Sequence, residues 1–413
     1  MARILALLGV VAGHLTLAVI DHGPDGALRG TNLLAIRPGW GWIAMLSPMA
    51  IFFAAAGWAN AHGTLRSAAP RLRSLIGLAA AVVSVWVGVA WAVKLATGDG
   101  RVLVDGARIA TQPLWFLAAY VPLTAGSPAV ARLARRPVAA VAGCLIMLAI
   151  LDAARFGPGI PSWIGWLGFF VAWSVPWIVG TAWRSRVEAG SGFDERRVGV
   201  GLLVGGAVAA YLLVRLGGYS AALIDAIPGS RSNTNPPTLY TAVAGLSQVG
   251  LLMITARWLD RAGTRWRRWW NLAGEAAVGV YALHLSALAL CAGVIALGLP
   301  VPMRLTGGWW ASRPLWFGVV LGLTGLLAWC AALIRTWVAG QAPPRTGPPA
   351  TAAVLRTGAG LATIGGAVIG MRGPRTPLTA TACVLTLIGS WLLLAPRGRR
   401  PSMRAPDDAQ RLP

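Results

Sequence analysis

Apolar residues dominate this chain in long runs, and polar residues collect in the short stretches between them. A helix that crosses a bilayer needs about 20 predominantly apolar residues. Runs near this length occur at 4–20, 40–60, 75–96, 111–126, 137–152, 163–181, 198–216, 238–257, 275–297, 314–335, 352–370 and 376–395. The pattern predicts an all-α fold, a polytopic transmembrane helical bundle with a ten-span core and about two further C-terminal helices.

A shift in composition before the last two runs predicts the domain organisation, because a Pro-rich stretch separates them from the rest. We expect a transmembrane core over residues 1–337 and a linker over 338–350. Two additional transmembrane helices are expected over 351–396, followed by a basic, disordered cytoplasmic tail over 397–413.

Composition and net charge narrow the class of protein. Only 12% of the residues are charged and the mean hydropathy is +0.65, whereas a soluble domain carries about 25% charged residues. The net charge of +23 at first suggests nucleic acid. The charges fall in short clusters between apolar runs and form no basic stripe or nucleic-acid-binding module. We therefore expect membrane lipid, and no nucleic acid, among the partners.

The basic residues also predict an orientation. If the N-terminus lies inside, the inside loops and tail hold 22 basic residues and the outside loops hold 10. Cytoplasmic loops carry the excess of Lys and Arg. We therefore expect a multi-pass protein of the cell (plasma) membrane with both termini in the cytoplasm. The near absence of lysine, with Lys94 alone, and the abundance of Ala, Gly, Pro and Arg indicate a GC-rich bacterial source.

Two histidines fall inside predicted spans, where ionisable side chains are uncommon and mark functional sites. His14 lies ten residues into the first run, and His284 lies nine residues past Glu275 in the ninth. At about 1.5 Å per residue, both lie about 15 Å deep, near the midplane of a ~30 Å core. A neutral imidazole serves as a general base in acyl transfer or as a relay in a proton-coupled transporter. The residues alone leave both alternatives open, together with a structural interhelical hydrogen bond.

The four cysteines are isolated within apolar runs, without a CxxC pair or the spacing of metal ligands. They are typical of small packing residues. We expect no metal and no prosthetic group.

Several short motifs occur in a fixed order along residues 3–335. They are Arg3 with His14 after ten intervening residues, Pro48 to Trp58 with Gly57, Pro113-Leu-Trp115-Phe-Leu117, Asn235-Pro-Pro-Thr-Leu239 and Val280-Tyr281-Ala-Leu-His284. In order and spacing the chain resembles the membrane acyltransferase 3 family, including actinobacterial members.

The resemblance implies an acyltransferase-3-like core that uses cytoplasmic acyl-CoA as donor. It implies transfer of an acyl group, in particular acetyl, to a hydroxyl of a carbohydrate, a lipid-linked glycan or another small or cell-envelope acceptor. His14 and His284 are then the expected catalytic residues, with His14 as the base. Arg3 is the expected contact for the donor, and Tyr281 and Trp115 are expected to line the substrate cavity. A transporter or flippase that uses the histidines, or a catalytically inactive member, remains the alternative.

Overall fold

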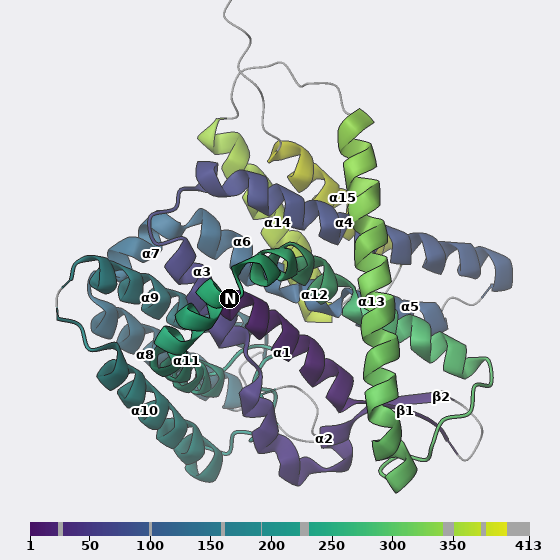
Figure 1. Ribbon diagram of the computed structural model, residues 1–413, viewed down its shortest axis with the longest axis horizontal. Helices are drawn as coiled ribbons and strands as arrows, with labels where there is room; N and C mark the ends of the chain where they lie inside the picture. The colour runs from purple at the N-terminus through teal and green to yellow at the C-terminus, as the bar shows by residue number, and fades with distance from the viewer. Residues whose placement is uncertain are drawn as a thin grey trace, which may run out of the picture.

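The computed structural model describes residues 1–23, 28–98, 101–157, 162–190, 192–223, 231–341, 351–372 and 377–394. Helices hold 82% of the residues and pack side by side (Figure 1), so the all-α, polytopic class is confirmed. The N-terminal half contains α1 (Ala2–Leu17), β1 (Ala18–His22), β2 (Leu28–Asn32), α2 (Leu33–Ile36), the 3₁₀ helix η1 (Pro38–Leu46), α3 (Met49–Ala59), α4 (Leu65–Thr97), α5 (Arg101–Thr111), the 3₁₀ helix η2 (Gln112–Phe116), α6 (Leu117–Ala125), α7 (Ser127–Leu133), α8 (Pro137–Phe156), the 3₁₀ helix η3 (Ser162–Leu167) and α9 (Gly168–Glu188). The C-terminal half contains α10 (Glu195–Leu216), α11 (Leu239–Arg265), α12 (Arg267–Ala296), α13 (Gly307–Gln341), α14 (Ala352–Arg372) and α15 (Pro377–Leu393).

The predicted ten-span count is not confirmed. Within the described part of the chain, seven helices are long and apolar enough to cross a membrane, or eight if a bent pair counts as one span. That pair, Gly106–Ala125 and Ser127–Leu133, bends by 74°. Other predicted spans are short or divided: α1 has 16 residues, and the run 40–60 breaks at Pro48, which separates η1 from the 11-residue α3. Proline removes a backbone donor and fixes φ, which ends a helix at this point.

A short antiparallel hairpin follows α1, and its first strand begins within the run 4–20 that was predicted as a span. Strands β1 and β2 pair from Ala18 opposite Asn32 to His22 opposite Leu28. The β-branched Val19 and Ile20 favour the extended backbone. Because β1 begins directly after α1, the hairpin lies at the C-terminal end of the helix that carries His14.

The long helices divide into a central and a peripheral group. The most apolar windows of α9, α11 and α12 are 61%, 72% and 56% buried, whereas those of α8, α10 and α13 are only 17%, 17% and 11% buried. On α10, Val200, Val204 and Val208 form an exposed stripe at a spacing of four residues. A helix with an outward apolar face is suited to contact with lipid tails, which places α8, α10 and α13 on the outside of the bundle.

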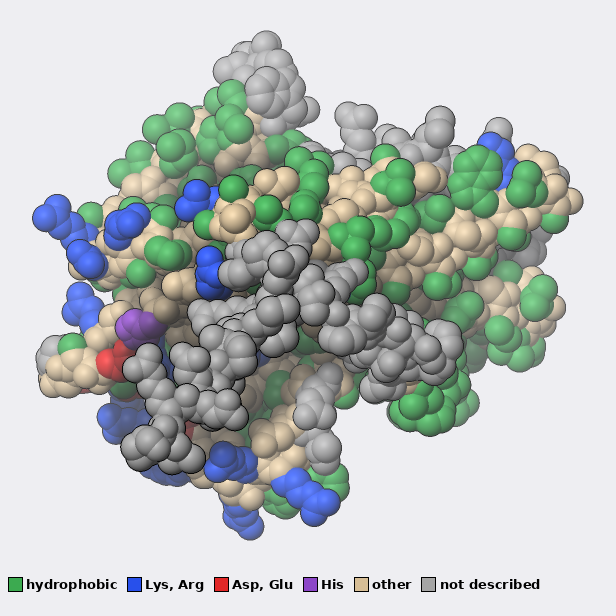
Figure 2. Space-filling view, turned by 90° about the horizontal axis from the view of Figure 1, so that it is seen from above, with side chains coloured by type: hydrophobic (Ala, Val, Ile, Leu, Met, Phe, Trp, Pro, Cys, Tyr) green, Lys and Arg blue, Asp and Glu red, His purple; other side chains and the backbone are tan. Residues whose placement is uncertain are grey.

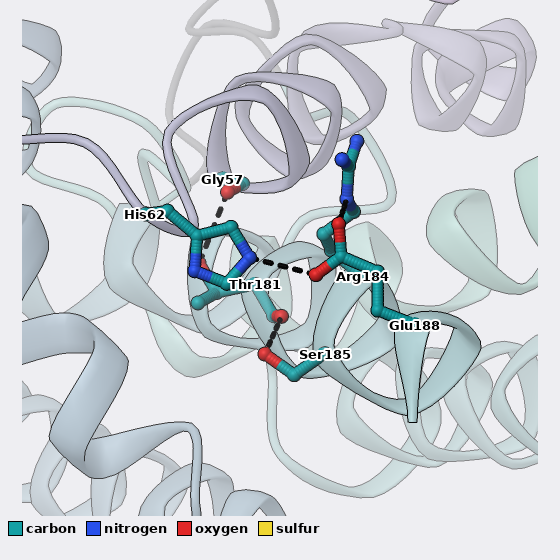
Figure 3. Close-up of polar contacts among 6 residues, drawn as sticks. All are labelled: Gly57, His62, Thr181, Arg184, Ser185 and Glu188. Carbon is teal, nitrogen blue, oxygen red and sulfur yellow. Dashed lines mark hydrogen bonds and ion pairs between the residues drawn. The ribbon is translucent and has the colours of Figure 1, made fainter. Parts of the chain in front are cut away.

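Helices α3 and α9 approach closely through two glycines. A Cβ on Gly57 would lie 2.3 Å from the carbonyl oxygen of Trp177, and one on Gly180 would lie 2.0 Å from that of Ala54. The hydroxyl of Thr181 donates to the carbonyl of Gly57 at 3.2 Å (Figure 3). Small residues and interhelical hydrogen bonds of this kind hold membrane helices together.

The two C-terminal helices pack onto the core. Helix α15 lies against α4, and α14 lies against α6 and η2. A Cβ on Gly366 of α14 would lie 2.6 Å from the backbone nitrogen of Ala118, so the contact with α6 is close. The Arg73 guanidinium lies 4.2 Å from the ring centre of Trp391, and its Nε donates to the Trp391 carbonyl at 3.3 Å. The predicted tail 397–413 and residues 342–350 of the predicted linker lie outside the described residues.

Segments predicted to share a side of the membrane meet at the same end of the bundle. At one end, His62 of the α3–α4 turn pairs with Glu188 at the end of α9. At the other end, Asp21 of β1 pairs with Arg304, which precedes α13. Each of these two ion pairs joins loops that the charge pattern assigns to the same side.

Candidate functional site

The two predicted site histidines lie in direct contact, one on α1 and the other on α12. Nδ1 of His14 is 2.8 Å from Nε2 of His284. The ring centres are 5.0 Å apart and the planes differ by 18°. Helices α1 and α12 pack through Val11, Leu15 and Leu288, which fixes the two rings at a common height.

The second nitrogen of His284 determines how protons are arranged in this pair. Nδ1 of His284 lies 2.6 Å from the backbone carbonyl oxygen of Tyr281. A carbonyl only accepts hydrogen bonds, so Nδ1 of His284 carries a proton and donates it. In the neutral ring Nε2 is then an acceptor, and Nδ1–H of His14 donates to it. This arrangement leaves Nε2 of His14 with its lone pair free.

The two rings differ in accessibility. The His284 residue is 0% exposed, whereas His14 is partly exposed. Nε2 of His14 is therefore the nitrogen of the pair that has no partner within the pair. A chain of carbonyl, imidazole and second imidazole has the geometry of a general base held in one tautomer by a second group.

Tyr281 lies one helical turn before His284 and joins α12 to η2. Its hydroxyl donates to the carbonyl of Pro113 at 3.0 Å, and its ring meets Phe116 edge to face at 5.2 Å. The side chain is 2% exposed. In this structure Tyr281 fixes the turn whose carbonyl holds His284.

Trp115 lies in an aromatic cluster beside the histidine pair. Its ring centre is 5.3 Å from that of Trp173 and 6.0 Å from that of Phe169. The cluster reaches Tyr281 through Phe116 and comprises Phe52, Phe53, Trp115, Phe116, Tyr120, Phe169, Trp173, Trp177 and Tyr281. The Nε1–H groups of Trp173 and Trp177 are buried, and no acceptor is found for either among the described residues. The sequence analysis singled out Trp115 and Tyr281 but not the other aromatic residues of this wall.

Arg3 is separated from the histidines. It lies exposed in the first turn of α1, eleven residues before His14, which corresponds to about 16 Å along the helix. The structure therefore places Arg3 at the mouth of the bundle and the imidazoles in its interior. A ligand that touches both must extend along α1.

A half-buried cation at the far end of α1 was not singled out by the sequence. The guanidinium of Arg313 lies 4.0 Å from the ring centre of Trp309, and it donates to the carbonyl of Ala18 at 3.3 Å. Ala18 caps the C-terminus of α1, where the helix dipole attracts positive charge. The spacing of Trp309, Arg313 and Trp316 on one helical face is the signal that could have found it.

A second polar network lies at this end, around Asp152 on α8. Its carboxylate accepts from the hydroxyl of Tyr219 at 2.9 Å and from the backbone nitrogen of Leu239 at 2.7 Å. Burial, together with the nearby Asp152 charge, raises the pKa of Tyr219 far above its ordinary value. The phenol therefore keeps its proton and donates. The network anchors the start of α11 to α8.

Among the described residues, no three His, Cys, Asp or Glu side chains come close enough to hold a metal ion. Separately, the contacts of the histidine pair suit proton transfer at Nε2 of His14.

Comparison with known proteins gives one match. A family model described as an acyltransferase domain matches residues 1–335 of the chain. No curated protein and no solved structure matches the chain.

Proposed function

Because the chain belongs to the membrane acyltransferase 3 family, we propose that it is a multi-pass enzyme of the cell membrane that O-acylates a hydroxylated acceptor. The donor is cytoplasmic acyl-CoA, and the group transferred is acetyl. The acceptor is a carbohydrate or another cell-envelope molecule. The observation that carries this proposal is the 2.8 Å contact between His14 and His284, which leaves Nε2 of His14 free to act as a base.

In the proposed reaction, Nε2 of His14 removes the proton of the acceptor hydroxyl as that oxygen attacks the thioester carbonyl. The tetrahedral intermediate collapses, the carbon–sulfur bond breaks, and the leaving thiolate takes the proton back from His14. The charge that forms on His14 is stabilised because its Nδ1–H already donates to His284. His284 in turn is held by the Tyr281 carbonyl. On this proposal His14 is the catalytic residue and His284 is a positioning residue.

The proposed orientation places the α1 N-terminus in the cytoplasm. The gathering of basic loops at that end supports it, because cytoplasmic loops carry the excess of Arg. Arg3 then contacts the phosphates of the donor, whose thioester extends along α1 toward His14. The acceptor reaches the pair from the opposite end of the bundle.

The test is transfer of a labelled acetyl group in membranes that carry the wild type or His14→Ala at matched protein levels. We expect the substitution to reduce product by about 10²- to 10⁴-fold, the usual contribution of a general base. His22→Ala is the matched control, since His22 lies on β1 outside the pair, and it should retain activity.

Equal product from wild type and His14→Ala would contradict the catalytic role. Uptake of a solute by wild-type vesicles without any acylated product would instead support the transporter alternative.

A further inference from the structure

We propose that the cavity between the α3–α4 turn and α7 binds a phosphate group of the acyl donor. This inference rests on the proposed function, which requires a phosphorylated thioester. The cavity has a volume of about 290 Å³ and is lined by Ala61, His62, Gly63, Thr64, Pro128, Ala131, Arg132 and Arg135.

Two arginines supply the positive charge of the cavity. Arg132 and Arg135 are three residues apart around the end of α7, and both side chains are exposed. Neither has a carboxylate partner among the residues that the structure describes. Arginine binds phosphate through a planar set of donors, often two at a time. Two unpaired guanidinium groups that line one cavity therefore favour an anion with several oxygens.

The start of α4 adds to the attraction. Thr64, which lines the cavity, caps this 33-residue helix by accepting from the backbone nitrogen of Ser67. No acidic residue lies in its first turn, although negative charge is stabilising there. Arg66 stands there instead. An anion bound in the cavity would compensate both the helix dipole and this misplaced cation.

Glu188, the carboxylate that contacts the cavity residue His62, is already engaged. Glu188 lies 2.7 Å from Nε2 of His62 and also pairs with Arg184 (Figure 3). Glu188 does not line the cavity. It holds His62 at the rim without neutralising Arg132 or Arg135. Figure 2 shows basic groups gathered on this side of the molecule around a histidine and an acidic group.

The cavity size indicates how much of the donor it holds. The volume of about 290 Å³ has room for a phosphate or pyrophosphate group. A lipid headgroup offers the same chemistry, but the position of the cavity favours the donor. Helix α3 leads from the cavity to Pro48, whose ring packs on Gly9 of α1.

His14 lies five residues beyond Gly9 along α1. The rises of α3 and of this part of α1 add up to about 24 Å. A phosphate held in the cavity therefore requires a long, flexible arm to bring the acyl group to His14. A pantetheine arm is such a linker, whereas a lipid phosphate carries its acyl chains into the bilayer.

The experiment measures binding of labelled coenzyme A to the purified protein in phosphatidylcholine nanodiscs. The test variant is Arg132→Ala/Arg135→Ala. The matched control is Arg136→Ala/Arg196→Ala, which removes the same charge from exposed positions at the same end but outside the cavity lining. We expect the Kd of coenzyme A to rise about tenfold or more in the test variant, from the loss of charged hydrogen bonds. In the control it should stay within about twofold.

A competition experiment identifies the bound group. Inorganic pyrophosphate should displace coenzyme A from the wild type. It should not displace the coenzyme A that still binds to the test variant. An unchanged Kd in the test variant, or an equal rise in the control, would overturn the site. Loss of co-purifying phosphatidylglycerol with unchanged coenzyme A binding would assign the cavity to lipid and overturn it as well.

The acyl-transfer assay separates this proposal from the proposed function. If His14→Ala abolishes transfer while the test variant keeps the wild-type Kd and KM for the donor, the proposed function is supported and the phosphate site is refuted. If the wild type transfers no acyl group yet binds coenzyme A through Arg132 and Arg135, the phosphate site is supported and the enzymatic role is refuted.

Discussion

Nδ1 of His14 lies 2.8 Å from Nε2 of His284, a contact that joins α1 to α12 across 270 residues of sequence. The pair is asymmetric, because His284 is sealed from solvent and bonded at both nitrogens, whereas His14 is partly exposed and bonded at one. This asymmetry divides the roles between two residues that the sequence presents as equivalent.

Replacing His284 should affect turnover rather than donor affinity. In His284→Ala, Nδ1–H of His14 loses its acceptor and the ring loses its fixed orientation. We expect kcat to fall on the order of 10²-fold, since orienting groups of this kind are worth 10²- to 10⁴-fold. The KM for acyl-CoA should stay within about twofold. Steady-state kinetics in membranes provide the measurement.

His284→Gln is the matched variant, because its side-chain oxygen lies near the position of Nε2 and still accepts from His14. It should recover part of the lost kcat. Equal kcat in the alanine variant and the wild type would refute the positioning role. A change in KM alone would also refute it.

The Asp152 network should contribute measurably to stability. Asp152→Ala removes the acceptor of the Tyr219 hydroxyl and of the Leu239 backbone nitrogen. The two hydrogen bonds contribute about 1–2 kcal/mol each, so we expect a loss of about 2–4 kcal/mol. Thermal unfolding in detergent, followed by tryptophan fluorescence, would report it as a lower apparent Tm.

A double-mutant cycle makes the test specific. Tyr219→Phe should lower stability by about 1 kcal/mol, and its effect should largely vanish in the Asp152→Ala background because the partners are shared. Tyr211→Phe, on the exposed face of α10, should change little. Additive effects of Asp152→Ala and Tyr219→Phe would show that the two side chains act independently.

The contact between α3 and α9 predicts a severe response to one methyl group. In Gly180→Ala the new Cβ would lie 2.0 Å from the Ala54 carbonyl oxygen, so the helices must separate. Overpacking of this kind typically costs about 1–3 kcal/mol. In Gly205→Ala on α10 the Cβ meets nothing within 4 Å, and the better helix propensity should leave stability equal or slightly higher. Fluorescence-detected size exclusion after heating compares the two, and an equal loss in both would contradict the close contact.

Hydropathy predicted the helical class, because this class depends on composition along the chain. It did not predict the break at Pro48, the 74° bend near Gly126 or the β1–β2 hairpin. An apolar run specifies burial, but it does not specify whether the backbone inside it is continuous. The number of spans was therefore the weakest part of the prediction.

For the site, the depth of the two histidines in the membrane was predictable, but the direction in which their side chains point was not. Counting residues placed His14 and His284 at one height, but two helices at equal depth can face apart. Val11 and Leu15 of α1 pack against α12, and this packing turns the two rings toward each other. The tautomer of His284 depends on the Tyr281 carbonyl. The cavity depends on residues of the α3–α4 turn and of the end of α7. Neither follows from spacing along the chain.

Because α14 and α15 cover α4, α6 and η2, the bundle supplies its own neighbour on that flank. A second copy in the same bilayer would find this side occupied, and so would an annular lipid. On this flank α14, rather than lipid, packs against η2 and α6, which carry Trp115 and Tyr120 of the aromatic wall. The wall thus has a protein neighbour within the same chain.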